Sequence, residues 1–287
     1  MSQYQIITDS GCDLPNEILE KLDLKMVSLS LIFQCNTLPD SVSGNIKAFY
    51  DAMRQGESAS TSAVNPDGWS VAMENELKQG LDVLVITFSS GLSTTYQSAV
   101  IAAEELQEKY PERKIIVVDS LCASLGQGLL CHYAAKKRDE GLSMEDLAAW
   151  LEENKGNVCQ WFTVDDLKYL KRGGRIGAGT ALLGTMLSIK PVLHVDDQGH
   201  LVSVSKTRGR KASIQAMLEQ MVNLSLPGEN DFITICHGDC YEDAQYLAEL
   251  CKEKLGVKEV FIGYTGAVIG SHSGPGTLAL FFMGKQR

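Results

Sequence analysis

The sequence lacks the features that mark several large classes of protein. No apolar run approaches the ~20 residues of a membrane-spanning helix. Residues 1–5 have neither the basic n-region nor the apolar h-region with which a secretory signal begins. The eight cysteines are scattered singly, so we expect free thiols, no metal site and a cytoplasmic protein. A formal net charge of −10 disfavours nucleic acid as a partner, because phosphate contacts need clustered Lys and Arg.

Motifs for nucleotides and metals are missing as well. The candidate anion loop described below has neither the Gly-x-Gly-x-x-Gly of a dinucleotide turn nor the Gly-Lys-Ser/Thr of a P-loop. Cys236, His237 and Cys240 come nearest to metal-ligand spacing. Cys236, however, ends an apolar strand, so we expect its side chain in the core.

What is present is a regular alternation of elements in a chain of 287 residues, of which 44% are hydrophobic and 22% charged. This size and composition are typical of a globular protein with one or two domains. The expected strands of the first half are Tyr4–Thr8, Lys25–Phe33, Asp82–Thr87 and Lys114–Asp119. The expected helices are Asp13–Leu22 with Asp13 as N-cap, Asn45–Arg54, Asn65–Gln79, Thr94–Tyr110, one from the segment Ser120–Gly128 to Glu140, and Ser143–Asn154. This order predicts a mainly parallel sheet with helices on both faces.

The pattern changes near residue 158. The expected elements from there on are strand Val158–Thr163, short helices Asp166–Lys171 and Ala181–Leu187, hairpin strands Pro191–Val195 and Leu201–Lys206 about the turn Asp196–His200, helix Arg210–Asn223, strand Phe232–His237, helix Tyr241–Leu255, and strands Lys258–Ile262 and Thr277–Met283. A hairpin combined with long helices implies a mixed sheet. The sequence therefore predicts an α/β fold with two domains: residues 1–160 with a mainly parallel, Rossmann-like sheet, and residues 161–287 with a mixed sheet.

Two loops rich in hydroxyl groups each precede a helix. One follows the strand Asp82–Thr87 and contains Ser93 and Thr94, and the other contains Thr61 and Ser62. The N-terminus of a helix offers free N–H groups and a favourable dipole to an anion. Ser93 is therefore a candidate anion ligand, although serine is also a preferred N-cap and could serve only that purpose.

Three further side chains are candidates for a structural or functional role. His272 lies in Gly270–Gly276, which we interpret as a turn, and histidine can bind an anion and change its charge near neutral pH. Arg175, in a glycine-rich turn, could pair with a carboxylate or simply be a surface residue. Asp9 ends the first strand, and we expect it to brace a loop by accepting backbone N–H bonds.

Seven segments, in order and spread over nearly the whole chain, resemble the motifs of the DegV family. They are Thr8–Leu14, Thr61–Pro66, Ser89–Ala99, Val118–Ser120, Leu170–Ile176, Ile189–Leu193 and Gly270–Gly276. Members of that family are bacterial cytosolic proteins that bind a long-chain fatty acid. They present it to a separate fatty acid kinase, which phosphorylates the carboxylate to an acyl phosphate. The resemblance implies two α/β domains, an acyl tunnel between or beside them, and no cofactor apart from the bound fatty acid.

The resemblance also implies roles for single residues. Thr61 and Ser93 would bind the fatty-acid carboxylate, with backbone N–H groups near Ser62 and Thr94 assisting. His272 would contact the same head group. Thr94 stands where the family usually has Gly, which places an extra side chain beside the head-group loop.

Other implied features concern the tunnel and the partner. Arg175 would lie at the tunnel mouth, close to the head group or the kinase. Ala63-Val64 replaces the more usual Gln-Pro of the family, a change that leaves the hydroxyl groups in place. The expected tunnel lining, which could equally be ordinary core, is Ala181–Leu187, Leu278–Met283, Phe33 and Ile269.

Alternative functions stay open at this point. Ser93 and His272 could form an acyl hydrolase or transferase, but the Gly-x-Ser-x-Gly elbow is absent, and only Asp9 or Asp119 could orient the histidine. Dihydroxyacetone kinase resembles the family in fold, so the chain could instead be the substrate-holding half of a small-molecule kinase. The basic run Lys206–Lys211 is either a solvated helix start or a docking patch for an acidic partner. Transient contact with a membrane surface is a further expectation.

Overall fold

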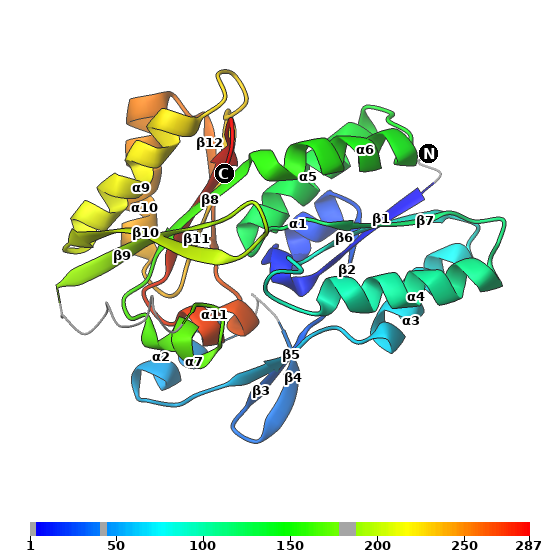
Figure 1. The fold of residues 1–287 in the computed structure, drawn as a ribbon, viewed down its shortest axis with the longest axis horizontal. Helices are drawn as coiled ribbons and strands as arrows, with labels where there is room; N and C mark the ends of the chain where they lie inside the picture. The colour runs from blue at the N-terminus through cyan, green and yellow to red at the C-terminus, as the bar shows by residue number, and fades with distance from the viewer. Residues whose placement is uncertain (1–3, 41–44, 178–187) are drawn as a thin grey trace.

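The computed structural model describes residues 4–40, 45–177 and 188–287, which form three β-sheets with helices packed around them (Figure 1). The two larger sheets occupy opposite halves of the view, and a small antiparallel sheet projects from the lower side. One large sheet is parallel and the other is mixed. This is the α/β architecture that the sequence predicted.

The parallel sheet has the strand order β2-β1-β6-β7. Its strands are β1 Tyr4–Asp9, β2 Leu24–Val27, β6 Asp82–Thr87 and β7 Ile115–Asp119. The described helical segments between residue 4 and residue 157 are η1 Ser10–Cys12, α1 Asn16–Lys21, α2 Ile46–Arg54, α3 Pro66–Leu77, α4 Thr95–Lys109, α5 Leu125–Asp139, α6 Met144–Asn154 and η2 Lys155–Asn157. Alternate strand side chains point to opposite faces. Ile6 and Leu84 pack with α1, α5 and α6, whereas Ile7 and Val85 pack with α3 and α4.

The mixed sheet has the strand order β10-β9-β8-β13-β11-β12, in which only β11 and β12 pair in parallel. Its strands are β8 Val158–Thr163, β9 Ile189–Val195, β10 Leu201–Arg208, β11 Phe232–His237, β12 Glu259–Tyr264 and β13 Leu278–Met283. The helices of this half are α7 Lys168–Arg172, α9 Arg210–Leu224, α10 Tyr241–Leu255 and α11 Ala267–Ser273. Helices α9 and α10 cover one face. The other face packs against α5, which therefore joins the two sheets in one core.

The division into domains at residue 160 stays a prediction. Strand β8 crosses that position and pairs only within the mixed sheet. The hairpin predicted about Asp196–His200 is confirmed by the antiparallel pairing of β9 and β10. The predicted helix Ala181–Leu187 lies outside the described residues.

The predicted strand Lys25–Phe33 is wrong, because the chain forms two strands there. Strand β2 ends at Val27, and β3 Ser30–Phe33 pairs with β4 Asn36–Pro39 and β5 Ser60–Ser62 in the small sheet. Leu29 marks the change of direction, since its N–H donates to Ser10 Oγ rather than to a neighbouring strand. The loop expected around Thr61 is thus partly a strand, which holds Thr61 beside Leu31.

Two of the three helix caps predicted from the sequence are present in the structure. Asn65 and Ser143 accept N–H bonds at the starts of α3 and α6, as predicted. Asp13 is not the N-cap of α1: it has a φ of 52° after η1, and its buried carboxyl accepts the hydroxyl of Ser124. Asp9 braces the loops as expected, because its carboxylate accepts the N–H groups of Gly11 and Phe88 at 2.9 and 2.7 Å.

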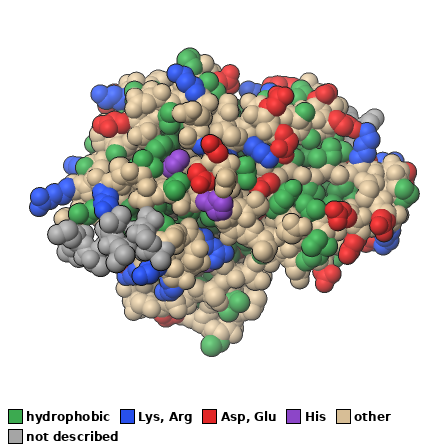
Figure 2. All heavy atoms as spheres, viewed as in Figure 1, with side chains coloured by type: hydrophobic (Ala, Val, Ile, Leu, Met, Phe, Trp, Pro, Cys, Tyr) green, Lys and Arg blue, Asp and Glu red, His purple; other side chains and the backbone are tan. Residues whose placement is uncertain are grey.

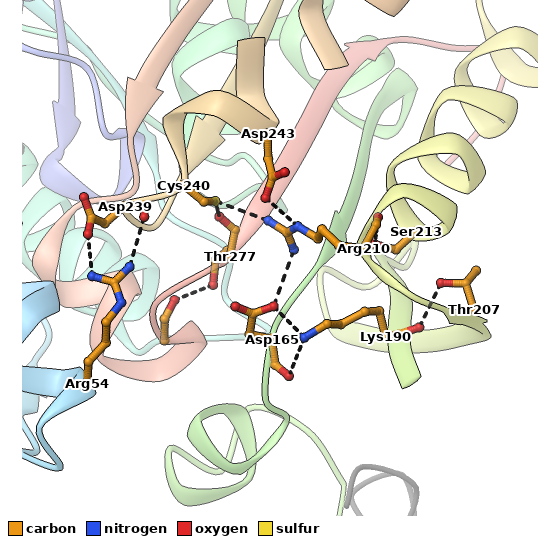
Figure 3. Close-up of polar contacts among 11 residues, drawn as sticks. Arg54, Asp165, Lys190, Thr207, Arg210, Ser213, Asp239, Cys240, Asp243 and Thr277 are labelled. Carbon is orange, nitrogen blue, oxygen red and sulfur yellow. Dashed lines mark hydrogen bonds and ion pairs between the residues drawn. The ribbon is translucent and has the colours of Figure 1, made fainter. Parts of the chain in front are cut away.

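Ion pairs link elements that are distant in the sequence (Figure 3). Arg54 of α2 pairs with the carboxylate of Asp239 and donates to its carbonyl at 3.0 Å, which connects the two halves of the chain. Arg210 of the basic run donates to Asp243 at 2.8 Å. This part of Lys206–Lys211 therefore has a structural role, while Lys206 and Arg208 are exposed on β10.

Candidate functional site

A cavity of about 780 Å³ is lined by residues of the mixed sheet, of β5 in the small sheet, and of the loop that follows β6 of the parallel sheet. That volume falls within the range of roughly 300–1,000 Å³ that small-molecule sites occupy. Much of the lining is apolar, and includes Leu92, Phe162, Val195, Leu201, Ile269 and Phe281. All six residues that the sequence nominated also line it: Thr61, Ser62, Ser93, Thr94, Arg175 and His272. The fold thus brings residues from four distant motifs around one cavity.

Ser93 lies in the loop between β6 and α4, one residue before the N-cap Thr94. Its Oγ accepts the N–H of Thr95 at 3.2 Å and shares a hydrogen bond with Thr95 Oγ1 at 2.9 Å. A capping role is therefore real, and Ser93 is also one of the residues that line the cavity. Within the described residues, the N–H groups of Tyr96 and Gln97 have no acceptor, as expected for the first turn of a helix. This end of the cavity favours an anion.

Thr61 and His272, which are far apart in sequence, meet in the structure. Thr61 Oγ1 and His272 Nε2 are 2.8 Å apart, so they share a hydrogen bond. His272 does not lie in a turn as predicted: it belongs to the last turn of α11. Burial, assisted by the positive charges of Arg175 and Arg172, lowers the pKa of His272 to about 4. The imidazole is therefore neutral at pH 7, and the change of charge that the sequence suggested near neutral pH is shifted to about pH 4.

Arg175 connects the glycine-rich turn after α7 with the Ser93 loop. Its Nε donates to the carbonyl of Leu92 at 3.2 Å, and its Nη1 donates to the carbonyl of Gly173 at 2.6 Å. Burial lowers its pKa from the ordinary value. No carboxylate among the described residues pairs with Arg175. A half-buried guanidinium in such a setting gives the cavity a positive charge that an anionic head group could offset.

Comparison with known proteins shows the family of the chain. A family model described as "Uncharacterised protein, DegV family" matches residues 3–285. The chain belongs to the DegV family. A DegV domain-containing protein of Clostridium perfringens is 44% identical over 289 residues, with 100% of this chain and 99% of the relative covered.

Solved structures of DegV proteins share the fold. A DegV family protein from Thermus thermophilus whose structure describes fatty acid binding has a TM-score of 0.88 and 31% identity, with 98% of this chain and 99% of that chain covered. DegV of Bacillus subtilis, described as a fatty acid binding protein, has a TM-score of 0.83 and 31% identity, with 99% and 100% covered. A stearic acid-binding protein from Eubacterium ventriosum has a TM-score of 0.87 and 26% identity, with 98% of each chain covered.

The cavity lining of this DegV protein differs in part from the predicted tunnel. Ile269 lines the cavity, as do Ala279 and Phe281 of β13, which is the alternate spacing that a strand requires. Phe33 is not among the lining residues; its ring instead packs edge to face on Phe49, with centroids 5.4 Å apart. The predicted lining segment Ala181–Leu187 lies outside the described residues.

Sequence reasoning missed one side of the cavity, formed by Ala123, Ser124 and Gln160. Gln160 is buried in β8, where its Oε1 accepts the N–H of Ala123 at 2.9 Å and its Nε2 donates to the carbonyl of Leu121 at 3.2 Å. These two bonds hold the segment after β7 against the mixed sheet. The signal that could have revealed this contact is an amide within an otherwise apolar strand, since a buried polar group needs partners.

The residues of a hydrolase triad are present but do not assemble. Ser93 bonds to Thr95, and His272 bonds to Thr61, so in the described chain no hydrogen bond joins Ser93 to His272. The carboxylate of Asp9 accepts the N–H groups of two loops, and that of Asp119 accepts those of Ser90 and Leu121. Neither acid orients the histidine. In the same described segments, no helix combines the length and the apolar character needed to cross a membrane.

Proposed function

We propose that this DegV protein binds a long-chain fatty acid, with the carboxylate at the Ser93 loop and the tail along the apolar part of the cavity. The observation that carries the proposal is the head-group cluster of Thr61, His272, Arg175 and Ser93, all of which line the cavity. In it Thr61 bonds to His272, and Arg175 is tied to the Ser93 loop through Leu92. Hydroxyls, helix N–H groups and one guanidinium hold a carboxylate without a metal.

The binding energy would come mainly from the tail. Each buried CH₂ contributes about 0.8 kcal/mol, so a sixteen-carbon chain gains on the order of 10 kcal/mol before ordering costs. A cavity of about 780 Å³ with apolar walls suits such a chain. A bound carboxylate would also raise the pKa of His272, because an opposite charge favours the protonated imidazole. The head group would then recruit the histidine as a charged partner.

The named ligands of the related structures support the same proposal. The DegV proteins of Thermus thermophilus and Bacillus subtilis are described as binding fatty acids, and the Eubacterium ventriosum protein as binding stearic acid. Each is similar to this chain over nearly its full length.

We further propose that the protein is a cytoplasmic carrier without catalytic activity, which presents the carboxylate to a separate fatty acid kinase. Arg175 belongs to the head-group cluster and could contact either the ligand or that partner. Lys and Arg side chains gather on the left of the molecule, over β9, β10 and α7, although the protein is acidic as a whole (Figure 2). Such a local basic surface would favour an acidic partner.

The decisive experiment is to denature the purified protein, extract it into organic solvent and identify lipids by mass spectrometry. We expect a stoichiometric fatty acid, and a rise in Tm when palmitate or oleate is added to delipidated protein. An empty extract together with no thermal shift would overturn the proposal.

The kinase step needs its own test. The delipidated protein, loaded with palmitate, would be incubated with ATP and a bacterial fatty acid kinase, and acyl phosphate would be trapped with hydroxylamine. Product that forms only when all three components are present supports the carrier role. Product formed without this protein would refute it.

A further inference from the structure

The loop that carries Ser93 is held from outside by a turn of the mixed sheet. This turn, Asp196–His200, connects β9 to β10 and lies against residues 89–91. Ser89 is fully buried, and its Oγ donates to the carbonyl of Gly199 at 2.9 Å. One hydrogen bond therefore joins the loop after β6 of the parallel sheet to the hairpin of the other sheet.

Ser89 transmits this contact to Ser93. The carbonyl of Ser89 accepts the N–H groups of Leu92 and Ser93, each at 3.1 Å. Its Oγ also accepts the N–H of Gly91 at 3.2 Å. The N–H groups of Gly91, Leu92 and Ser93 are thus all bound to Ser89, so a shift of Ser89 moves Ser93.

The two backbones approach too closely for any side chain. A Cβ added at Gly91 would lie 2.8 Å from Gln198 O, Gly199 C and Gly199 O. Backbone atoms cannot swing aside as a flexible side chain can, so the loop or the turn would have to move. Gly91 is required here by close approach and not by an unusual φ.

The turn is itself rigid enough to act as a support. The carboxylate of Asp196 accepts the N–H groups of Gln198 and His200, each at 2.9 Å. Gly199 has a φ of 77°, which suits glycine, and its N–H donates to the carbonyl of Asp196 at 2.9 Å. Arg287 donates to that same carbonyl at 3.2 Å and so fastens the turn to the core.

We infer that Ser89 and the Gly91–Gly199 contact are positioning elements for the head group, and that carboxylate recognition at Ser93 depends on the β9–β10 turn. The inference rests on the proposed fatty-acid function. Neither Ser89 nor Gly199 is among the residues that line the cavity, so they act through Ser93. A defect in positioning should weaken binding of the carboxylate and leave binding of the tail unchanged.

The test compares two ligands with the same sixteen-carbon tail, palmitate and hexadecanol. Their Kd values are measured by calorimetry on delipidated wild type, Ser89→Ala and Gly91→Ala. Ser213→Ala is the matched serine control, because Ser213 is also buried and its Oγ donates to a carbonyl, that of Arg210, at 2.8 Å in α9. Gly156→Ala is the glycine control, since a Cβ there meets nothing within 4 Å.

We expect Ser89→Ala to weaken the binding of palmitate roughly tenfold, which is the effect of disturbing the one hydrogen bond from Ser93 to the charged carboxylate. Gly91→Ala should weaken palmitate binding more. Hexadecanol should change by less than about twofold, and both controls should behave as wild type. Equal losses for the two ligands, or palmitate binding that is unchanged in Ser89→Ala, would overturn the inference while the proposed function stands. A wild type that binds neither ligand would overturn the proposed function, and this inference with it.

Discussion

His272 gives the folded protein a pH dependence that a single substitution can isolate. Burial lowers the pKa of His272 to about 4 in the folded chain, whereas a histidine in an unfolded chain titrates near 6.5. Between these values the unfolded chain binds a proton that the folded chain does not, so the free energy of unfolding rises with pH. At about 1.36 kcal/mol per pH unit, the folded protein loses about 3 kcal/mol from this residue as the pH falls from about 6.5 to 4.

Other buried groups titrate over the same interval, so the prediction concerns a difference between variants. Burial lowers the pKa of His237 to about 4 as well, which adds a loss of the same sign. Burial raises the pKa of Asp9 to about 7. That contribution has the opposite sign, because it stabilises the protein at low pH and is lost as the pH rises through about 7. The profile of the wild type alone therefore cannot report on His272.

The assay is urea unfolding of wild type and His272→Gln at several pH values between about 4 and 7. The free energy of unfolding of wild type minus that of the variant should rise by about 3 kcal/mol across this range. Bound palmitate should flatten the rise, because its carboxylate raises the pKa of His272. The free energy of unfolding of wild type minus that of His237→Gln should rise with pH equally with and without palmitate, since His237 is not among the residues that line the cavity. A difference that is flat for His272→Gln would refute the reasoning.

Three further substitutions test the head-group cluster and its support. Thr61→Val should weaken palmitate roughly tenfold by calorimetry, because it removes the hydroxyl that bonds to His272, and Thr61→Ser should restore binding. Gly173→Ala would place a Cβ on His272 Nδ1, so it should weaken the binding of palmitate and lower the free energy of unfolding in urea by about 1–3 kcal/mol. An unchanged affinity for palmitate would contradict this packing of Gly173 on His272. Tyr50→Phe should cost about 1–2 kcal/mol in urea, because the buried hydroxyl donates to the carbonyl of Thr265 at 2.7 Å. Tyr133→Phe is its control, because that hydroxyl donates to the backbone carbonyl of Glu229 at an exposed site. An equal loss of stability in Tyr133→Phe would show that burial of the Tyr50 hydroxyl is not the cause.

Much of the parallel sheet could be predicted because three of its four strands, β1, β6 and β7, are short runs rich in apolar residues between polar or turn residues. The strands expected at Tyr4–Thr8, Asp82–Thr87 and Lys114–Asp119 appear with nearly those limits. The prediction of a single strand over Lys25–Phe33 failed because no glycine or proline in that segment marks the break between β2 and β3. The break at Leu29 is made by Ser10, whose hydroxyl accepts the Leu29 N–H across the fold, and no local pattern reports such a long-range bond.

The site could be predicted as a set of residues but not as an arrangement. The motifs nominated Thr61 and His272 separately, while their contact depends on β5 joining β3 and on α11 packing beside them. Helix α11 was missed because Gly270-Ser271-His272-Ser273 has a low helix propensity. Tertiary contacts override that preference: the N–H of Val268 donates to Asp40 at 3.0 Å, and the segment packs against Tyr50.

The glycines of the motifs therefore mark close contacts more than flexibility. A Cβ at Gly270 would overlap the hydroxyl of Tyr50, one at Gly173 would overlap the ring of His272, and one at Gly91 would press on the β9–β10 turn. Gly173 lies against His272 itself, and Gly91 lies against the turn that supports the Ser93 loop. From sequence alone these segments look like turns and loops, because glycine favours both in general. In the fold Gly91 and Gly270 are points where the two halves of the chain come close, and Gly173 packs on His272 of the head-group cluster. Adding a single methyl group at these points should disturb the head group before it disturbs the tail.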